Sequence, residues 1–299
     1  MYLATVTCNR DFQQLLLQAE SIQKFVEPCK HVIIVNEIHP DLDFYHKWLD
    51  RYYTKHELIL LPRIQYPYPV EGFKQHLHNP GTGVEWRIQQ LQKLLLAYEF
   101  DDDYVLLDSK NFFIKPISLE YYENPEFYGS GAVMIEPERK DHFKQSFITY
   151  KKILNKPEVD ICSTIATPYK IHYELLRNRC DIEKLGYYLF SPEYNKSISS
   201  EFQFYGVVIS DKITEFRRSI FKPGPKIFWA WDPHVDHIGF KLREITEDGT
   251  FLTGFHRDFL NLTGPEHIKL INSWLKFTVG LDNSIIPYAR DQQMSPYTI

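Results

Sequence analysis

The sequence has no long apolar run and few cysteines. No stretch approaches the roughly 18 consecutive apolar residues that a membrane-spanning helix needs, and the first residues lack the basic, apolar and small-residue regions of a signal peptide. Only four cysteines occur in 299 residues. None forms a CxxC pair, which argues against a structural zinc site or a disulfide framework. We therefore expect a cytoplasmic protein without a transmembrane segment.

Basic clusters and glycine-rich loops are missing as well. The formal net charge is −5, and no run of five basic residues occurs, so nucleic acid is not an expected partner. There is no GxxxxGK[ST], GxGxxG or GxSxG motif, which disfavours P-loop, dinucleotide-binding and α/β-hydrolase chemistry. Aromatic residues are abundant, at 15% of the chain. They could fill the core or stack on sugars.

Alternating strand and helix patterns fill the first half of the chain. Short β-branched runs at 2–7, 31–36 and 57–61 are separated by segments with helical spacing. The order β-α-β-α-β is typical of half a nucleotide-binding sheet. A helix is predicted over 84–98, and the aperiodic segment 62–83 before it indicates a long loop. We predict an α/β fold, with a mixed Rossmann-like sheet flanked by helices.

The second half is less regular. Residues 168–179 and 265–277 have helical patterns, whereas 202–210, 226–231 and 251–256 are predicted as short strands. No internal repeat or linker is visible. The simplest organisation is a single domain.

The strongest functional pattern is a helix followed by an acidic strand end. WRIQQLQKL at 86–94 precedes YVLLDSKNFFIKP at 104–116, which places Asp108 at the carboxyl end of a buried strand, where ligands bind in open α/β sheets. This pair resembles GT-A glycosyltransferases, in particular a little-studied bacterial and phage group of predicted sugar transferases with a WxxQQxxKL helix. Segments 166–176, 200–206 and 253–259 are similar to that group in the same order.

The resemblance implies a nucleotide-sugar donor and a glycan acceptor. It implies one GT-A-like domain over 1–299, with residues 1–116 binding the nucleotide sugar and residues 117–299 on the acceptor side. The donor is expected to be UDP-linked, and the acceptor a glycan or other surface polymer. The residues expected to frame the donor are Thr7, Asn9, Arg10, Asn36, Glu37, Arg87, Gln90, Lys93, Asp108, Ser109 and His256.

One position departs from the acidic motif of GT-A enzymes. Their usual Asp-x-Asp holds a divalent metal on the diphosphate, but Lys110 stands where the second aspartate is expected. Residues two apart in an extended chain point the same way, and a cation ~4 Å from a divalent ion costs about 8 kcal/mol at an effective dielectric of 20. Three interpretations stay open. In the first, Lys110 neutralises the departing diphosphate without a metal, helped by His256 and by Arg10 or Arg257. In the second, Lys110 turns to solvent or pairs with Asp103 and Asp108. In the third, Asp108 and Asn111 bind Mn²⁺ or Mg²⁺ weakly.

Transfer to a hydroxyl group needs a base in inverting enzymes. Glu201 is the first candidate and Asp232 the second, while Tyr205, Trp229 and Trp231 could supply stacking faces for a sugar. Glu201 could instead form a surface salt bridge or end a helix or strand.

Two alternative functions remain. One is a catalytically inactive GT-A-like protein that binds a nucleotide or glycan. The other, less favoured, is a sugar nucleotidyltransferase, which should carry a glycine-rich basic loop after the first strand. TCNRDFQQ at 7–14 contains no glycine.

Overall fold

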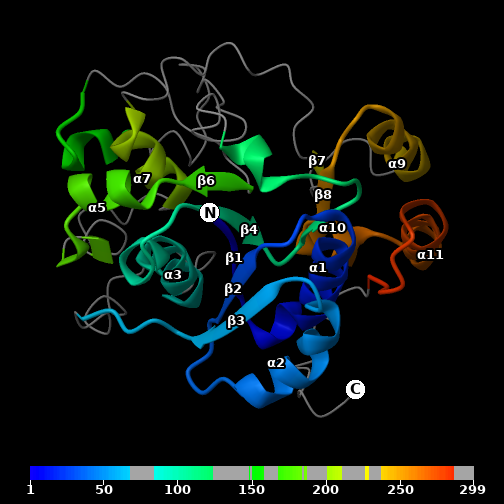
Figure 1. The fold of residues 1–299 in the computed structure, drawn as a ribbon. Helices are drawn as coiled ribbons and strands as arrows, with labels where there is room; N and C mark the ends of the chain where they lie inside the picture. The colour runs from blue at the N-terminus through cyan, green and yellow to red at the C-terminus, as the bar shows by residue number, and fades with distance from the viewer. Residues whose placement is uncertain are drawn as a thin grey trace. The chain divides into compact units, whose positions relative to one another are not determined.

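The computed structural model of the chain is shown in Figure 1 and describes residues 1–67, 84–123, 148, 150–157, 168–183, 185–186, 201–210, 226–228 and 237–285. Contacts divide the chain into two compact units. Unit 1 comprises Met1–Val6, Arg63–Leu106 and Tyr122–Phe221, and unit 2 comprises Thr7–Pro62, Leu107–Tyr121 and Lys222–Ile299. None of the helices in the described ranges has the length and apolar character needed to cross a membrane. The single-domain organisation stays a prediction.

Eight strands of the described residues form two sheets. The five-stranded sheet has the order β3-β2-β1-β4-β6, with β1 (Tyr2–Thr7), β2 (Lys30–Val35), β3 (Glu57–Pro62), β4 (Tyr104–Asp108) and β6 (Tyr169–Ile171). The three-stranded sheet has the order β5-β8-β7, with β5 (Asn111–Phe113), β7 (Lys226–Phe228) and β8 (Leu252–Phe255).

Unit 2 places its helices around β2, β3 and the three-stranded sheet. Strands β2 and β3 are parallel with Val32 opposite Ile59, while β8 pairs antiparallel with β5 and parallel with β7. Residues 32–35 are fully buried, as a near-continuous Val/Ile run predicts for a strand covered on both faces. The helices of this unit are α1 (Phe12–Phe25), α2 (Leu42–Leu49), α9 (Ile238–Glu247), α10 (Arg257–Leu262) and α11 (Pro265–Trp274).

The helices α9, α10 and α11 contribute to one apolar cluster together with residues of α1, β5 and β8. The cluster includes Phe112, Phe255 and Phe259, whose rings stack in sequence with centroids 5.8 and 5.9 Å apart. Helix α1 packs on β5, which brings the polar side chains on that face of α1 to the turn between β4 and β5.

Unit 1 contains helices α3 (Val84–Glu99), α5 (Tyr173–Arg179) and α7 (Glu201–Val208). Helix α3 packs against both of the others, and its residues 90–97 are all buried. In the same unit β4 and β6 pair antiparallel, with Leu106 opposite Tyr169.

The first-half elements are confirmed, whereas two second-half predictions are wrong. Residues 201–208 form helix α7 and not the expected strand. Seven of these eight residues are buried. The sequence therefore shows no exposed polar face from which a helical period could be recognised. The helix expected over 168–179 begins at Tyr173 and is preceded by strand β6. The expected loop lies largely outside the described residues, because only 62–67 of it are described, and Pro62 is the last residue of β3.

Candidate functional site

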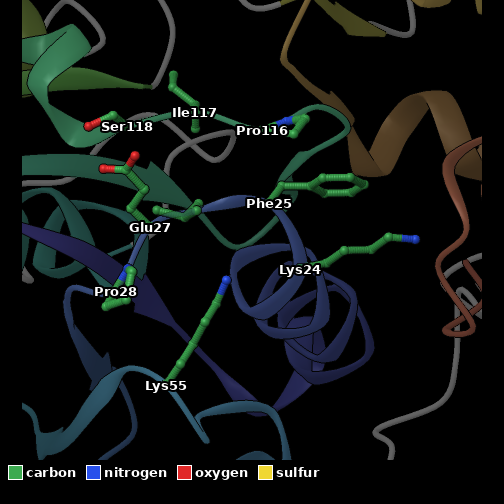
Figure 2. A pocket seen from close by; sticks show the side chains of 9 residues that line it. Lys24, Phe25, Glu27, Pro28, Lys55, Pro116, Ile117 and Ser118 are labelled. Atoms are coloured by element: carbon green, nitrogen blue, oxygen red, sulfur yellow. The ribbon is translucent and has the colours of Figure 1, made fainter.

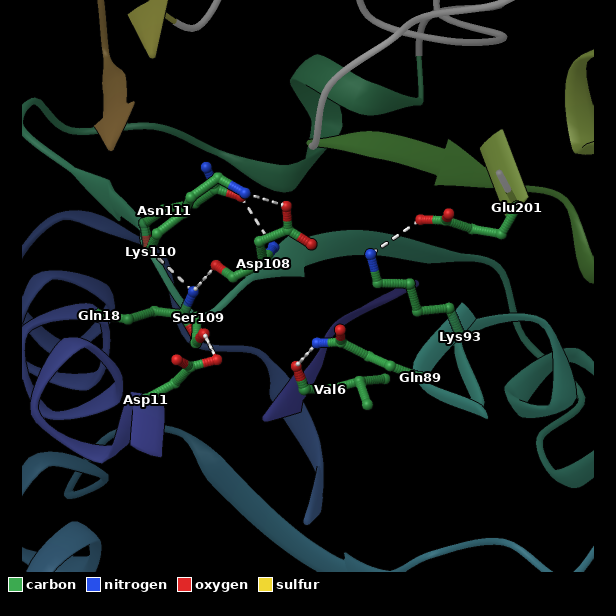
Figure 3. A network of polar contacts seen from close by, with 10 residues as sticks. All are labelled: Val6, Asp11, Gln18, Gln89, Lys93, Asp108, Ser109, Lys110, Asn111 and Glu201. Atoms are coloured by element: carbon green, nitrogen blue, oxygen red, sulfur yellow. Dashed lines mark hydrogen bonds and ion pairs between the residues drawn. The ribbon is translucent and has the colours of Figure 1, made fainter. Parts of the chain in front are cut away.

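The turn between β4 and β5, residues 108–111, is held by side chains from α1 and from the turn itself (Figure 3). Gln18 on α1 donates through Nε2 to the backbone carbonyl oxygens of Asp108 and Asn111, both at 2.8 Å. The Asp108 N–H donates to Asn111 Oδ1 at 2.7 Å. The Ser109 hydroxyl donates to Asp11 Oδ2 at 3.2 Å. These bonds fix the backbone that carries the predicted strand-end motif.

Lys110 and Asp108 form an ion pair at this turn. The Lys110 Nζ lies 2.5 Å from Asp108 Oδ2, and the two side chains are 16% and 22% exposed. Of the open interpretations, the structure shows the one in which Lys110 pairs with Asp108. Asp103, the other partner named there, belongs to unit 1 and pairs with Lys170 and His172. The pair places a positive charge directly on the Asp108 carboxylate at the end of β4. The described side chains contain no group of three or more His, Cys, Asp or Glu arranged to hold a metal ion.

The predicted residues that follow β1 and β2 also come together in unit 2. The Asn9 N–H donates to Glu37 Oε1 at 2.9 Å, and the hydroxyl of Tyr45 on α2 donates to Asn9 Oδ1 at 3.0 Å. The Asn36 N–H donates to the Thr7 carbonyl at 2.7 Å. These bonds leave the second carboxylate oxygen of Glu37 as an acceptor at the carboxyl ends of the strands, where a nucleotide is expected.

Burial keeps two neighbouring groups of this region neutral. It raises the pKa of the Cys8 thiol to about 12, with the Asp11 carboxylate adding to the effect. It also raises the pKa of Tyr45, whose hydroxyl therefore keeps its proton and donates to Asn9. Arg10 is exposed, and His256 lies half-buried between β8 and α10.

A second polar cluster lies within unit 1 and is fully buried. Lys93 on α3 and Glu201 on α7 form an ion pair with Nζ–Oε1 at 2.8 Å, and their side chains are 5% and 0% exposed. With its amide nitrogen turned toward the carboxylate, Gln90 also donates to Glu201 Oε1 at 3.2 Å. The Tyr104 hydroxyl donates to the Lys93 carbonyl at 2.7 Å. Glu201 is therefore not part of a surface salt bridge, and Figure 3 shows the Lys93 ammonium directed at its carboxylate.

Two other predicted residues of unit 1 are buried. Arg87 is 1% exposed, and burial lowers the pKa of its guanidinium. The Tyr205 hydroxyl accepts the His172 N–H at 2.8 Å, and its ring lies beside that of Tyr169 with centroids 6.2 Å apart. Asp232, Trp229 and Trp231 lie outside the described residues.

Gln18 was not among the residues that the sequence pointed to. A signal existed, because Gln18 falls on the face of α1 that carries Leu15 and Ile22, at i+3 and i−4 spacing. A glutamine on an apolar face must find hydrogen-bond partners when that face is buried. Its partners, 90 and 93 residues away, could not be read from the local pattern.

A surface hollow of about 450 Å³ lies elsewhere in unit 2 (Figure 2). It is lined by the end of α1, the residues before β2, Lys55 and residues 116–118. The Lys24 ammonium at its edge donates to the carbonyls of Val279 and Gly280, at 3.0 and 2.6 Å. None of the predicted site residues lines this hollow.

Comparisons with known proteins bear on the fold. No protein-family model and no curated protein sequence matches the chain. Among solved structures, the apo form of mouse xyloside xylosyltransferase 1 is 10% identical with a TM-score of 0.49, over 85% of this chain and 96% of that one. An active-site mutant of LgtC is 12% identical with a TM-score of 0.50, over 91% of this chain and 96% of that one. The chain has the GT-A fold. The predicted fold class is thus confirmed; at 12% identity, the likeness defines the fold and not the activity.

Proposed function

We propose that this chain is a glycosyltransferase that moves a sugar from a UDP-linked donor to a hydroxyl group of a glycan or surface polymer. The observation that carries the proposal is the Lys110–Asp108 ion pair at the carboxyl end of β4, in a chain of GT-A fold. The polar ends of β1 and β2, with Asn9 and Glu37, supply further donors and acceptors in the same unit. The choice of UDP over GDP or CMP follows the sequence resemblance.

The transfer step requires charge stabilisation on the leaving group. The acceptor oxygen bonds to the anomeric carbon while the bond from that carbon to the diphosphate oxygen breaks, and the nucleoside diphosphate leaves with the electron pair. The Lys110 ammonium neutralises this developing charge, and Asp108 and Ser109 orient the ammonium and the ribose. A divalent ion would have to displace Lys110 from Asp108, so we propose transfer without a bound metal.

The proton of the acceptor hydroxyl needs a base, for which Glu201 stays the first candidate. Lys93 and Gln90 hold its carboxylate in one orientation. A general base must lie within hydrogen-bond reach of the proton that it accepts. Asp232 stays the second candidate.

A panel of nucleotide sugars tests the proposal. UDP, GDP and CMP sugars are incubated with the protein in Mn²⁺ or in EDTA, and thermal stability and release of the nucleoside diphosphate or monophosphate are measured together. We expect stabilisation by UDP sugars and release of UDP that persists in EDTA. Absence of any nucleotide effect on stability and on release would contradict the proposal.

A catalytically inactive binding protein is the second candidate. It is favoured by one observation: both candidate catalytic charges of the described residues, Lys110 and Glu201, have internal ion-pair partners. Such a protein would be stabilised by the nucleotide sugar and release no nucleotide when supplied with glycan acceptors.

A further inference from the structure

Gln18 links helix α1 to the turn that carries Asp108 and Lys110. Its side chain is fully buried, and its single amide nitrogen donates to two carbonyl oxygens, of Asp108 and Asn111, each at 2.8 Å. We propose that Gln18 is a positioning residue for the donor site, which fixes the 108–111 turn so that the Lys110 ammonium meets the diphosphate. This inference rests on the proposed function and adds a residue that touches neither the substrate nor the reacting atoms.

The number of bonds at one turn sets Gln18 apart from an ordinary buried glutamine. The Asp108 N–H is held by Asn111 Oδ1 and the Asp108 carbonyl by Gln18, so both backbone polar groups at the end of β4 are fixed. Gln18 uses both amide hydrogens on the two ends of the same four-residue turn. The Gln18 amide nitrogen can make both bonds only where it lies between the two carbonyl oxygens.

The two hydrogen bonds from Gln18, which we call the clamp, also determine which groups of the turn can contact a ligand. Carbonyl oxygens that accept from Gln18 are directed toward α1 and are not offered as ligands for a hard cation, which prefers such oxygens. The side chains of Asp108 and Lys110 remain partly exposed. The turn therefore offers the Lys110 ammonium at a fixed place, held by the Asp108 carboxylate, and a cationic donor is what recognition of an anionic diphosphate requires.

Ser21, one turn further along α1, provides a matched control. It is also fully buried; its hydroxyl donates to the Gln18 carbonyl at 2.7 Å and accepts the Phe113 N–H at 3.0 Å. Ser21 thus ties the same helix to β5 without contacting the turn. A loss that came only from loosening α1 against β5 would appear equally in Gln18→Leu and Ser21→Ala.

The experiment compares wild type, Gln18→Leu, Gln18→Asn and Ser21→Ala. Dissociation constants for UDP and a UDP sugar are measured in EDTA, together with amide hydrogen exchange at residues 109–111 in the free proteins. We expect Gln18→Leu to weaken UDP binding about tenfold or more and to speed exchange at 109–111, with Ser21→Ala near wild type in both. The shorter amide of Gln18→Asn is expected to give an intermediate result, and it serves as the test if Gln18→Leu does not fold.

A double-mutant cycle with Lys110→Ala completes the test. If Gln18 acts through Lys110, removing Lys110 costs several-fold less in the Gln18→Leu background than in wild type. Wild-type UDP affinity in Gln18→Leu, or equal losses in Gln18→Leu and Ser21→Ala, would overturn the positioning role while the proposed function stands. If wild type itself binds no nucleotide, the proposed function fails, and unchanged exchange at 109–111 then refutes the clamp separately.

Discussion

Replacing Lys110 tests whether a side-chain cation substitutes for a metal in this fold. Lys110→Ala removes the ammonium that lies 2.5 Å from Asp108 Oδ2. Lys110→Asp goes further, because it creates the Asp-x-Asp arrangement that GT-A enzymes use to hold a divalent ion. Lys115, two residues after β5, is the matched control, since Lys115→Ala also removes one positive charge only five residues further along the chain.

The size of the effect follows from charge separation. A unit charge about 4 Å from a phosphate oxygen contributes about 4 kcal/mol at an effective dielectric of 20, a value suited to a side chain that is 16% exposed. This corresponds to a rate loss of up to about 1,000-fold. We expect Lys110→Ala to lower the rate of UDP release in EDTA by about 100- to 1,000-fold, and Lys115→Ala to change it less than about threefold.

The assay is UDP release from the donor that stabilises the wild type most, in EDTA and across a Mn²⁺ titration. Lys110→Asp is expected to be inactive in EDTA and to regain turnover as Mn²⁺ is added, whereas wild type responds little to Mn²⁺. If Lys110→Ala releases UDP in EDTA at the wild-type rate, the ammonium has no part in neutralising the leaving group. The reasoning from the ion pair is then refuted.

Three further predictions concern the two units separately. Glu201→Gln is expected to keep donor binding and to lose turnover, and to lower the free energy of unfolding by about 3 kcal/mol because Lys93 stays buried without a countercharge; an unchanged denaturant midpoint would contradict the buried pair. Burial lowers the pKa of His31 to about 3, below the unfolded value of about 6.5. Neutral His31 therefore causes no loss of stability above pH 6.5. Below that pH, its contribution lowers the free energy of unfolding by about 1.4 kcal/mol per pH unit until about pH 3. His31→Gln should flatten that decline in urea titrations at several pH values. A methyl group at Gly186 would collide with the Tyr66 ring, so Gly186→Ala is expected to cost about 1–3 kcal/mol by thermal denaturation. Gly239→Ala is expected to cost much less, because a methyl group there would meet only Leu270 Cδ2, at an ordinary contact distance of 3.5 Å.

The sequence predicted most of the first half of the fold because its strands are covered on both faces. Residues 32–35 read as one β-branched run and are fully buried, and the helix predicted over 84–98 is α3. The prediction of a strand over 202–210, where helix α7 lies, was wrong for a different reason. Seven of its eight residues are buried, Glu201 and Gln203 among them, so no exposed polar face marks the helical period.

The sequence could name candidate site residues but not most of the contacts that they make. Residues after β1, β2 and β4 could be named because ligands gather at the carboxyl ends of strands, and the pairing of Lys110 with Asp108 was one of the open interpretations. The bonds from Lys93 to Glu201 and from Gln18 to Asn111 join residues 108 and 93 positions apart. Such partners depend on how helices pack, which periodicity does not encode.

The interleaving of the two units limits how this chain can be cut and how early it can fold. Unit 1 is assembled from three stretches of sequence and unit 2 from three others, and the boundary between Val6 and Thr7 falls inside strand β1. No truncation from either end therefore yields one unit without part of the other. During synthesis, unit 1 lacks part of its chain until residue 221 has left the ribosome. Unit 2 lacks part of its chain until its last segment, Lys222–Ile299, has followed. Strand β1 must then wait for its neighbour β4, which begins at Tyr104, and the unpaired strand edge makes an incomplete chain prone to association.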